Sequence, residues 1–387
     1  MFEPTYTAAL ERLNAFVPHA GRDYASKRNY DDLANVSALS PYIRHRLITE
    51  EDVLKATLSR HSASAAEKFI QEVYWRTYWK GWLELRPGVW AQYRADLQAA
   101  LNRIQTESGL RQDWEAACKG ETGIACFDHW ARQLTETGYL HNHARMWFAS
   151  IWIFTLRLPW TLGADFFLRH LLDGDPASNT LSWRWVGGLQ TIGKTYLARP
   201  DNIAKYTEGR FNPTGLASFA APLEGAPHPA RRPVPVSDSF DPNRRTGLLI
   251  TEEDLSPGWL LDQLRPVATA TLQTTQSRSP LAVSPNVTEF VRGWLHDCST
   301  RFAQRLGPVT EVTAQTLAAW ASAHDLDQIV TSYVPTGPTR DALQDANLVQ
   351  VLRSYDAAAW PHATHGFFRF KEKIPGLLGQ IKGLSAV

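Results

Sequence analysis

The sequence has only three cysteines, Cys118, Cys126 and Cys298. An odd number of cysteines argues against a disulfide framework, and their spacing is unlike a metal-ligand spacing such as C-x-x-C. We therefore expect no bound metal. A reducing compartment suits such a chain, so we expect the protein in the cytoplasm.

Long hydrophobic runs are also missing. The longest apolar stretch, residues 146–158, is interrupted by Arg157 and is shorter than the roughly 20 residues that span a bilayer as a helix. The first residues carry Glu3 and Glu11, unlike the continuous apolar segment of a secretory signal peptide. These features predict a soluble protein with no membrane partner.

Net charge is small as well. The 387 residues hold 40 Lys and Arg against 39 Asp and Glu, a net charge of +1 at pH 7. Any contact with nucleic acid must therefore come from a local patch. The C-terminal part has no GxGxxG or GxxxxGK[ST] motif, so a standard dinucleotide or P-loop site has no support there.

Tryptophan, in contrast, is abundant, with 15 residues, and residues 138–185 combine aromatic side chains with charges. Apolar residues recur at helical spacing from Met146 to Leu156, which predicts a helix. Asp173 and Asp175 need a partner if they are buried, and Arg145 is the obvious one. Beside an amide, such an ion pair makes a polar socket for a planar heteroaromatic ligand. The alternative is a structural ion pair in an aromatic core.

The order and spacing of these residues resemble the FAD-binding domain of the DNA photolyase and cryptochrome family. The family pattern TGW-hydrophobic-HNR-x-R-M is similar to residues 137–146, and D-G-D-x-x-x-N-x-x-x-W-x-W is similar to residues 173–185. Two shorter patterns, S-x-L-S-P-Y-L and E-x-x-W-R, are similar to residues 37–43 and 72–76. The resemblance spans residues 22 to 200, whereas the segment after Trp185 departs from the family's TGTD signature.

This resemblance implies a non-covalently bound FAD. Ser37 and Ser40, with Pro41 following, are also residue types that cap a helix start, where free amides bind phosphate. An ordinary capped loop is the alternative. The residues that the resemblance assigns to the cofactor are Tyr24, Ser37, Leu39, Ser40, Arg76, Asn142, Arg145, Asp173, Asp175 and Asn179.

The resemblance also implies light-driven DNA repair, in which photoexcited reduced FAD gives an electron to a cyclobutane pyrimidine dimer. The expected partner is DNA that contains such dimers, bound by a monomer. Trp183 and Trp160 match two electron-relay tryptophans, and Trp114 or Trp90 are candidates for a third. The residues that match the dimer-contacting positions are Glu72, Trp75, Asn142, Met146 and Trp185.

Other interpretations remain open for these residues. Glu72 and Arg76 have the i, i+4 spacing of an ordinary helical ion pair, and any tryptophan can be core packing. A cryptochrome-like photoreceptor would use the same flavin for signalling without repair. A nucleic-acid-binding remnant without flavin is the third possibility.

The chain is expected to be mostly α, with a helical photolyase-type FAD-binding domain over residues 1–221. Six prolines mark a linker at residues 222–245. Over residues 246–387, apolar runs at 248–251, 268–272 and 328–333 alternate with helical patterns that include 287–306 and 345–355, which predicts a smaller parallel α/β domain. The family normally has an antenna-pigment α/β domain before the helical one. We interpret this region as a permuted or reduced relative of that domain; an unrelated α/β module is the alternative, and no particular pigment is indicated.

Overall fold

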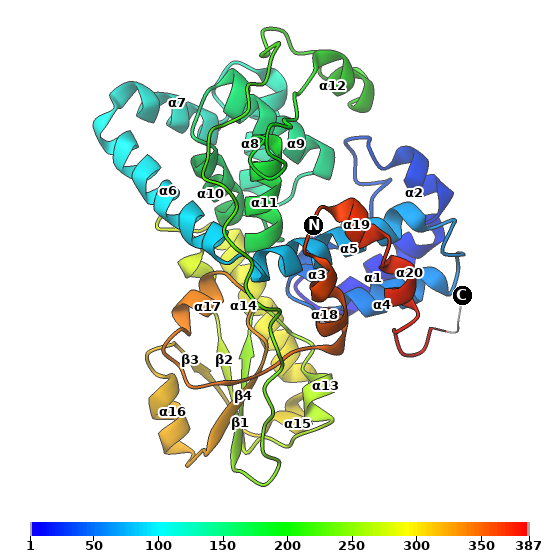
Figure 1. Ribbon diagram of the computed structural model, residues 1–387, viewed down its shortest axis with the longest axis vertical. Coiled ribbons are helices and arrows are strands. Elements are labelled where there is room, and N and C mark those ends of the chain that lie inside the picture. The colour runs from blue at the N-terminus through cyan, green and yellow to red at the C-terminus, as the bar shows by residue number, and fades with distance from the viewer. Residues whose placement is uncertain (1, 385–387) are drawn as a thin grey trace. The chain divides into compact units, whose positions relative to one another are not determined.

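The computed structural model describes residues 2–384, and the chain forms two compact units (Figure 1). The first unit comprises Met1–Gly21, Ser37–Leu85 and Arg231–Val387, and the second comprises Arg22–Val36 and Arg86–Ala230. The change from the second unit to the first at residues 230–231 falls inside the proline-rich stretch 222–245. The division into domains at 1–221 and 246–387 stays a prediction.

The first unit joins helices from the beginning and the end of the chain. The long helix α5 packs against α18 and α19 near the C-terminus, and α1 packs against α14. The helices before the sheet are α1 (Tyr6–Phe16), η1 (Val17–His19), α3 (Ser40–Arg44), α4 (Glu50–Leu58) and α5 (Glu67–Glu84).

The sheet of this unit has five parallel strands in the order β3-β2-β1-β4-β5. The predicted mostly helical fold with a smaller parallel α/β part is confirmed. The strands are β1 (Thr246–Thr251), β2 (Ala268–Leu272), β3 (Val309–Val312), β4 (Gln328–Ser332) and β5 (Val349–Val351). The helices among and after them are α13 (Gly258–Leu261), η3 (Thr275–Arg278), α14 (Pro285–Arg301), α15 (Ala303–Leu306), α16 (Leu317–Ala323), α17 (Pro338–Ala342), α18 (Ser354–Ala359), η4 (Trp360–His362), α19 (Phe367–Lys371) and α20 (Ile374–Leu378).

One face of the sheet packs against α16. Leu249 of β1 is paired in register with Ala270 of β2, and both belong to a buried cluster with Trp320 of α16. Gly247 is needed in β1, because a Cβ there would clash with Leu326 and lie 2.7 Å from the ring of Trp320. Small residues on the strands thus let α16 lie close to the sheet.

Two local predictions were wrong. Residues 345–355 look like an amphipathic helix but contain the three-residue strand β5, which is too short to show a strand period. Ser37 and Ser40 were expected to cap a helix. Helix α3 instead begins at Ser40 with Leu39 in the capping position and no side-chain cap, while Ser37 Oγ accepts a hydrogen bond from the Leu39 amide at 3.3 Å.

The second unit is helical. The helix predicted from Met146 is α9, which begins at Asn142 and runs directly into the π-helical segment η2. No described helix is long and apolar enough to cross a membrane. The elements are α2 (Arg22–Lys27), α6 (Gly88–Thr106), α7 (Ser108–Lys119), α8 (Ala125–Thr137), α9 (Asn142–Ser150), η2 (Ile151–Thr155), α10 (Trp160–His170), α11 (Pro176–Val186) and α12 (Pro200–Tyr206).

Candidate functional site

The residues that the sequence singled out fall into both compact units. Each group lies on a few elements and is described within its own unit. The first unit holds Ser37, Leu39, Ser40, Glu72, Trp75 and Arg76. The second unit holds Tyr24, Asn142, Arg145, Met146, Trp160, Asp173, Asp175, Asn179, Trp183 and Trp185.

In the second unit, Arg145 and Asp173 form a two-pronged ion pair. Nη1 and Nη2 of Arg145 donate to the two carboxylate oxygens of Asp173 at 3.0 and 2.8 Å, and Nε donates to the carbonyl oxygen of Leu140 at 2.9 Å. Burial lowers the pKa of the Arg145 guanidinium, but the negative charge of Asp173 outweighs it and leaves that pKa raised. The pair that the sequence suggested is therefore present for Asp173.

Asp175 has another local role. Its side chain accepts a hydrogen bond from the Ser178 amide at 2.8 Å and caps the first turn of α11. One turn later, the side-chain amide of Asn179 donates to the carbonyl oxygen of Ala164 at 2.8 Å. This bond fixes the direction of the Asn179 side chain. Its amide oxygen accepts no hydrogen bond within residues 2–384.

Asn142 and Met146 lie on the same side of α9, because they are four residues apart. Asn142 is the first residue of the helix and is exposed, and Met146 is half-buried. Arg145 is on the adjoining turn of the same helix. The start of α9 thus presents an exposed amide, a thioether and a paired guanidinium. Tyr24 is buried on α2 in the same unit.

Trp183 is buried in an aromatic core. Its ring meets those of Phe167 at 5.1 Å and Trp152 at 6.1 Å, both edge-on, and its Nε1 has no hydrogen-bond partner among residues 2–384. A Cβ at Gly163 would clash with the Trp183 ring, so glycine there allows α10 and α11 to approach. Trp185, two residues on, is half-buried and stacks on Tyr196 at 5.7 Å.

Trp160 begins α10 and is half-buried. Its ring lies 5.7 Å from that of Tyr93, which in turn lies 5.3 Å from Trp90. The structure therefore connects Trp160 to Trp90 through Tyr93. Sequence reasoning did not foresee Tyr93, since a lone tyrosine on an amphipathic helix carries no signal of its own.

In the first unit, Glu72, Trp75 and Arg76 lie on α5. Arg76 forms an ion pair with Glu50 at 3.5 Å and donates to the carbonyl oxygen of Arg44 at 3.1 Å. The ring of Trp75 lies against that of Phe367 from α19, with centroids 3.6 Å apart and planes 12° apart. Arg76 and Trp75 thus both contact other residues of the first unit.

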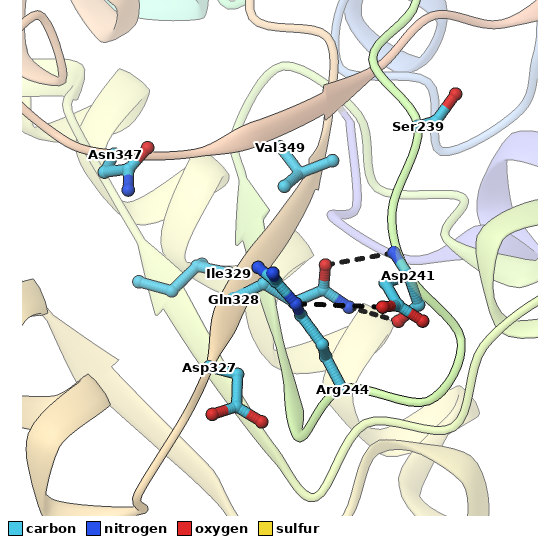
Figure 2. A pocket seen from close by; sticks show the side chains of 8 residues that line it. All are labelled: Ser239, Asp241, Arg244, Asp327, Gln328, Ile329, Asn347 and Val349. Carbon is cyan, nitrogen blue, oxygen red and sulfur yellow. Dashed lines mark hydrogen bonds and ion pairs between the residues drawn. The ribbon is translucent and has the colours of Figure 1, made fainter.

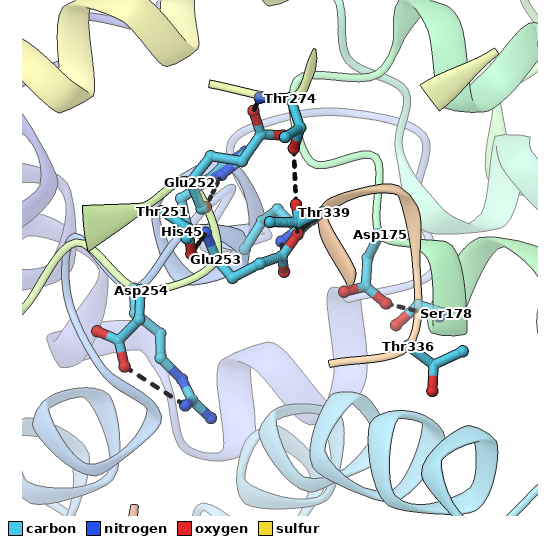
Figure 3. Close-up of polar contacts among 12 residues, drawn as sticks. His45, Asp175, Ser178, Thr251, Glu252, Glu253, Asp254, Thr274, Thr336 and Thr339 are labelled. Carbon is cyan, nitrogen blue, oxygen red and sulfur yellow. Dashed lines mark hydrogen bonds and ion pairs between the residues drawn. The ribbon is translucent and has the colours of Figure 1, made fainter. Parts of the chain in front are cut away.

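A cluster of buried charges at the carboxyl ends of β1 and β2 was missed by the sequence reasoning (Figure 3). Arg44 donates to both carboxylate oxygens of Glu253 at 2.7 and 3.0 Å, and the Thr339 hydroxyl donates to the same carboxylate. Glu252 accepts from the Thr274 amide and from the Thr275 hydroxyl. The signal was the acidic run at residues 252–254, directly after a predicted strand.

The same cluster continues into the helices before the sheet. Arg46 pairs with Asp356 at 2.8 Å and with Glu50 at 3.1 Å. Burial, followed by the charges of Arg44 and Arg278, holds the pKa of His45 well below its usual range and so favours the neutral imidazole. The buried charges of this cluster are thus paired with opposite charges, and removing one member of such a pair is costly.

A surface pocket of about 360 Å³ lies at the other edge of the sheet, where β4 and β5 begin (Figure 2). The side-chain amide of Gln328 donates to the Asp241 carbonyl oxygen and the Thr246 hydroxyl, at 2.6 and 2.7 Å. Arg244 lies 3.8 Å from the carboxylate of Asp241. None of the residues predicted for the cofactor or the dimer lines this pocket. The lining residues are Ser239, Asp241, Arg244, Asp327, Gln328, Ile329, Asn347 and Val349.

Comparison with known proteins finds a family model that matches the part of the chain with most of the predicted site residues. Residues 69–216 match the family model described as the FAD binding domain of DNA photolyase. This stretch is a photolyase-type FAD-binding domain. The predicted family resemblance is confirmed. The match continues past Trp185, through the segment that lacks the family's TGTD signature. Ser37, Leu39 and Ser40, as well as Tyr24, lie before the matched residues.

Curated relatives carry the same domain. The deoxyribodipyrimidine photo-lyase of Synechococcus sp. is 31% identical over 198 residues, which are 47% of this chain and 38% of the relative. The protein of the same name from Agrobacterium fabrum is 33% identical over 191 residues, 49% of this chain and 39% of the relative. The chain thus spans less than half the length of these two relatives.

Among solved structures, a bacterial class III photolyase from Agrobacterium tumefaciens is 28% identical, with a TM-score of 0.44. The similar part covers 53% of this chain and 43% of that protein.

The polar groups of the second unit fit a flavin ring, which has both N–H donors and carbonyl acceptors. Within the described residues, Nη1 and Nη2 of Arg145 each donate one hydrogen bond, both to Asp173, so each keeps a second N–H for a ligand. The amide oxygen of Asn179 is available to accept a hydrogen bond from a ring N–H. These residues would hold the flavin from one side by hydrogen bonds and charge.

Proposed function

We propose that this protein is a light-driven DNA repair flavoenzyme that splits cyclobutane pyrimidine dimers, acting as a monomer in the cytoplasm. The observation that carries the proposal is the match of residues 69–216 to the FAD binding domain of DNA photolyase. This stretch includes Glu72, Trp75, Asn142, Met146 and Trp185, the five residues that the resemblance assigns to the dimer. The α/β part remains proposed as a permuted relative of the family's antenna domain.

When bound, reduced FAD would supply the photoexcited electron for the repair. The chain's own residues hold and orient the cofactor. Arg145 and Asp173, fixed to each other by two hydrogen bonds, act on the polar edge of the ring, and Asn179 accepts a ring N–H. Asp175 supports this arrangement by capping α11, the helix that carries Asn179. Tyr24, Ser37, Leu39, Ser40, Arg76 and Asn142 are proposed to complete the cofactor contacts.

On the substrate side, Trp75 and Trp185 are proposed as stacking surfaces for a dimer that has left the DNA helix. Extruding a damaged base costs a few kcal/mol, less than extruding an intact one. Stacking on an aromatic side chain returns about 1 to 3 kcal/mol per base, so two tryptophans offset most of that cost. Glu72 and Asn142 add hydrogen bonds, and Met146 adds an apolar contact.

Equilibrium binding in the dark tests this proposal. Two oligonucleotides of the same sequence, one with a single cyclobutane dimer and one undamaged, are titrated with the purified protein at fixed salt. We expect clearly tighter binding to the damaged strand, because only a dimer leaves the helix cheaply. Equal affinities would contradict repair and favour the alternative, a cryptochrome-like photoreceptor that uses flavin photoreduction for signalling.

A further inference from the structure

Trp185, one of the two tryptophans proposed to stack on the dimer, rests on a single aromatic side chain. Its half-buried ring stacks on the ring of Tyr196, with centroids 5.7 Å apart and planes 28° apart. Among residues 2–384, Tyr196 is the one aromatic side chain in ring contact with Trp185. The orientation of the Trp185 indole therefore depends on how firmly Tyr196 is held.

The segment after Trp185 turns back and brings Tyr196 against that ring. Gly188 and Gly193 have φ angles of 79° and 80°, which glycine adopts without strain. The amide of Gly193 donates to the carbonyl oxygen of Gly188 at 3.0 Å, and the amide of Tyr196 donates to that of Val186 at 3.1 Å. This segment lacks the family's TGTD signature, so a departure from the family pattern places Tyr196.

A second departure from the family pattern lies at the hydroxyl of Tyr196. His143 stands where the pattern HNR-x-R-M has arginine, and its Nε2 lies 3.4 Å from the Tyr196 hydroxyl. Nδ1 of His143 lies 2.9 Å from the carbonyl oxygen of Asn29. Because a carbonyl only accepts, Nδ1 carries the hydrogen of the neutral ring and Nε2 accepts from Tyr196. The two departures from the family pattern thus contact each other.

We propose that Tyr196 and His143 are positioning residues for dimer recognition. Their hydrogen bond holds the Tyr196 ring, which in turn holds the Trp185 indole in the orientation that stacks on a flipped-out pyrimidine dimer. This proposal rests on the proposed function, in which Trp185 stacks on the dimer. The imidazole is itself held by Trp147, which stacks on it at 4.1 Å and 24°. The exposed Asn142, assigned to the same substrate, is the residue before His143 on α9.

The hydrogen bond makes this support sensitive to pH. Burial lowers the pKa of His143, which favours the neutral imidazole at neutral pH, and burial raises the pKa of the Tyr196 hydroxyl to about 12. As pH falls through the folded-state pKa of His143, which lies below about 6.5, Nε2 gains a proton and can no longer accept from Tyr196. The charged and titratable groups that face His143 are Asp31, which raises its pKa, Arg28, which lowers it, and His141, Tyr196 and Tyr206.

The test measures the preference for dimer-containing over undamaged oligonucleotides, in the dark, for wild type, Tyr196→Phe, Tyr196→Leu and Tyr206→Phe. Tyr196→Phe keeps the ring and removes the hydroxyl, so the preference at neutral pH should fall by about 2- to 10-fold, the net value of one neutral hydrogen bond. Tyr196→Leu also removes the stack on Trp185, so its preference should fall further. Tyr206→Phe is the matched control, since Tyr206 also lies against the His143 ring, at 5.1 Å, and should behave as wild type.

A pH series separates positioning from general support of the fold. Below about pH 6.5, the preference of wild type should fall toward that of Tyr196→Phe, whereas Tyr196→Phe lacks the hydrogen bond and should keep a constant preference. Thermal unfolding at each pH identifies the folded proteins, and Tyr196→Phe keeps the test decisive if Tyr196→Leu does not fold.

The outcomes distinguish this role from the repair function. If wild type prefers the dimer and the folded Tyr196 variants prefer it equally, the positioning role is wrong and the repair function stands. An equal loss in Tyr206→Phe, or the same pH profile for wild type and Tyr196→Phe, would also contradict the role. If no protein prefers the dimer at any pH, both proposals are wrong.

Discussion

Asp173 accepts one hydrogen bond from each terminal nitrogen of Arg145, at 3.0 and 2.8 Å, across 28 residues of sequence. The two side chains are unequally buried, with 22% of Arg145 exposed and 3% of Asp173. The ion pair therefore stabilises the buried carboxylate, while each terminal nitrogen of Arg145 keeps a second N–H for a ligand. This asymmetry suits a pair that holds a cofactor.

Replacing Asp173 with alanine should remove flavin from the purified protein. The substitution leaves the Arg145 guanidinium without its carboxylate, which costs about 3 to 5 kcal/mol for a buried pair and somewhat less here because Arg145 is partly exposed. The ratio of flavin absorbance to protein absorbance in the folded fraction measures the loss.

Asp128→Asn is the control for that experiment. Asp128 is also buried and accepts hydrogen bonds from the Thr122 amide, the Thr122 hydroxyl and the Gly123 amide. The variant should lower the stability of the fold without lowering the flavin content of the folded protein. Full flavin occupancy in Asp173→Ala would show that the pair does not hold the cofactor.

Trp183→Phe should slow the light-driven reduction of oxidised flavin strongly while flavin binding stays near normal. The indole Nε1 of Trp183 has no hydrogen-bond partner in the part of the chain that the structure describes, so the substitution breaks none of the described hydrogen bonds and keeps most of the packing volume. Absorbance changes under blue light, with an external reductant absent, follow the reaction. Trp147→Phe is the control, since Trp147 is equally buried in the same unit and is not assigned to the relay. Equal rates for wild type and Trp183→Phe would show that electrons reach the flavin by another route.

Trp75→Ala and Glu72→Gln should affect different steps. Loss of the Trp75 stacking surface should reduce the preference for damaged DNA by about 1 to 3 kcal/mol, with little change for undamaged DNA, whose binding comes from phosphate contacts. Glu72→Gln should lower repair per absorbed photon more than binding, because its hydrogen bond matters most as charge develops on the dimer. Binding and quantum yield, measured on the same oligonucleotide, separate the two effects. A photoreceptor would be indifferent to both substitutions.

The fold was predictable where a pattern is long or repeated. The spacing of apolar residues from Met146 to Leu156, which form α9 and η2, and the alternation of apolar runs with helices after residue 245 were enough for a helical part and a parallel sheet. The pairing of Arg145 with Asp173 also followed from a rule, because a buried carboxylate needs a cation nearby. The three residues of β5 were not predictable, since no period appears in so short a strand.

Contacts between distant parts of the chain could not be predicted. Arg44 and Glu253 are 209 residues apart, and nothing near either residue indicates the other. The same is true of Trp75 and Phe367, whose stacking depends on how α19 packs against α5. The acidic run after β1 showed that cations were needed there, but only the structure identifies Arg278, Arg44 and Arg353 as those cations.

The buried charges predict how stability changes with pH. Burial raises the pKa of Glu50, but the charges of Arg46, Arg76 and Lys80 outweigh it and lower that pKa to about 2. Because the folded-state value lies below the ordinary value of about 4.3, the stabilisation is complete above pH 4.3 and is lost as pH falls toward 2. Its size is on the order of 3 kcal/mol. Thermal unfolding of wild type and Glu50→Gln should therefore differ at pH 6 and converge near pH 2.

Glu107→Gln is the matched control for that series. Arg103 and Glu107 have the same i, i+4 spacing as Arg46 and Glu50, but they are 54% and 46% exposed, and exposed pairs contribute little. The control should unfold like wild type at every pH. A difference between Glu50→Gln and wild type that does not shrink on acidification would contradict the assigned role of the Glu50 charge.

Repair in the light is the most direct measurement of the central claim. Purified protein with its flavin chemically reduced is mixed with a dimer-containing oligonucleotide, and intact thymines are counted after blue light and after an equal time in darkness. The account predicts multiple turnovers in blue light, none in darkness, and a loss of turnover in Asp173→Ala that follows the loss of flavin. Flavin-loaded, reduced protein that leaves the dimers intact under blue light would contradict it.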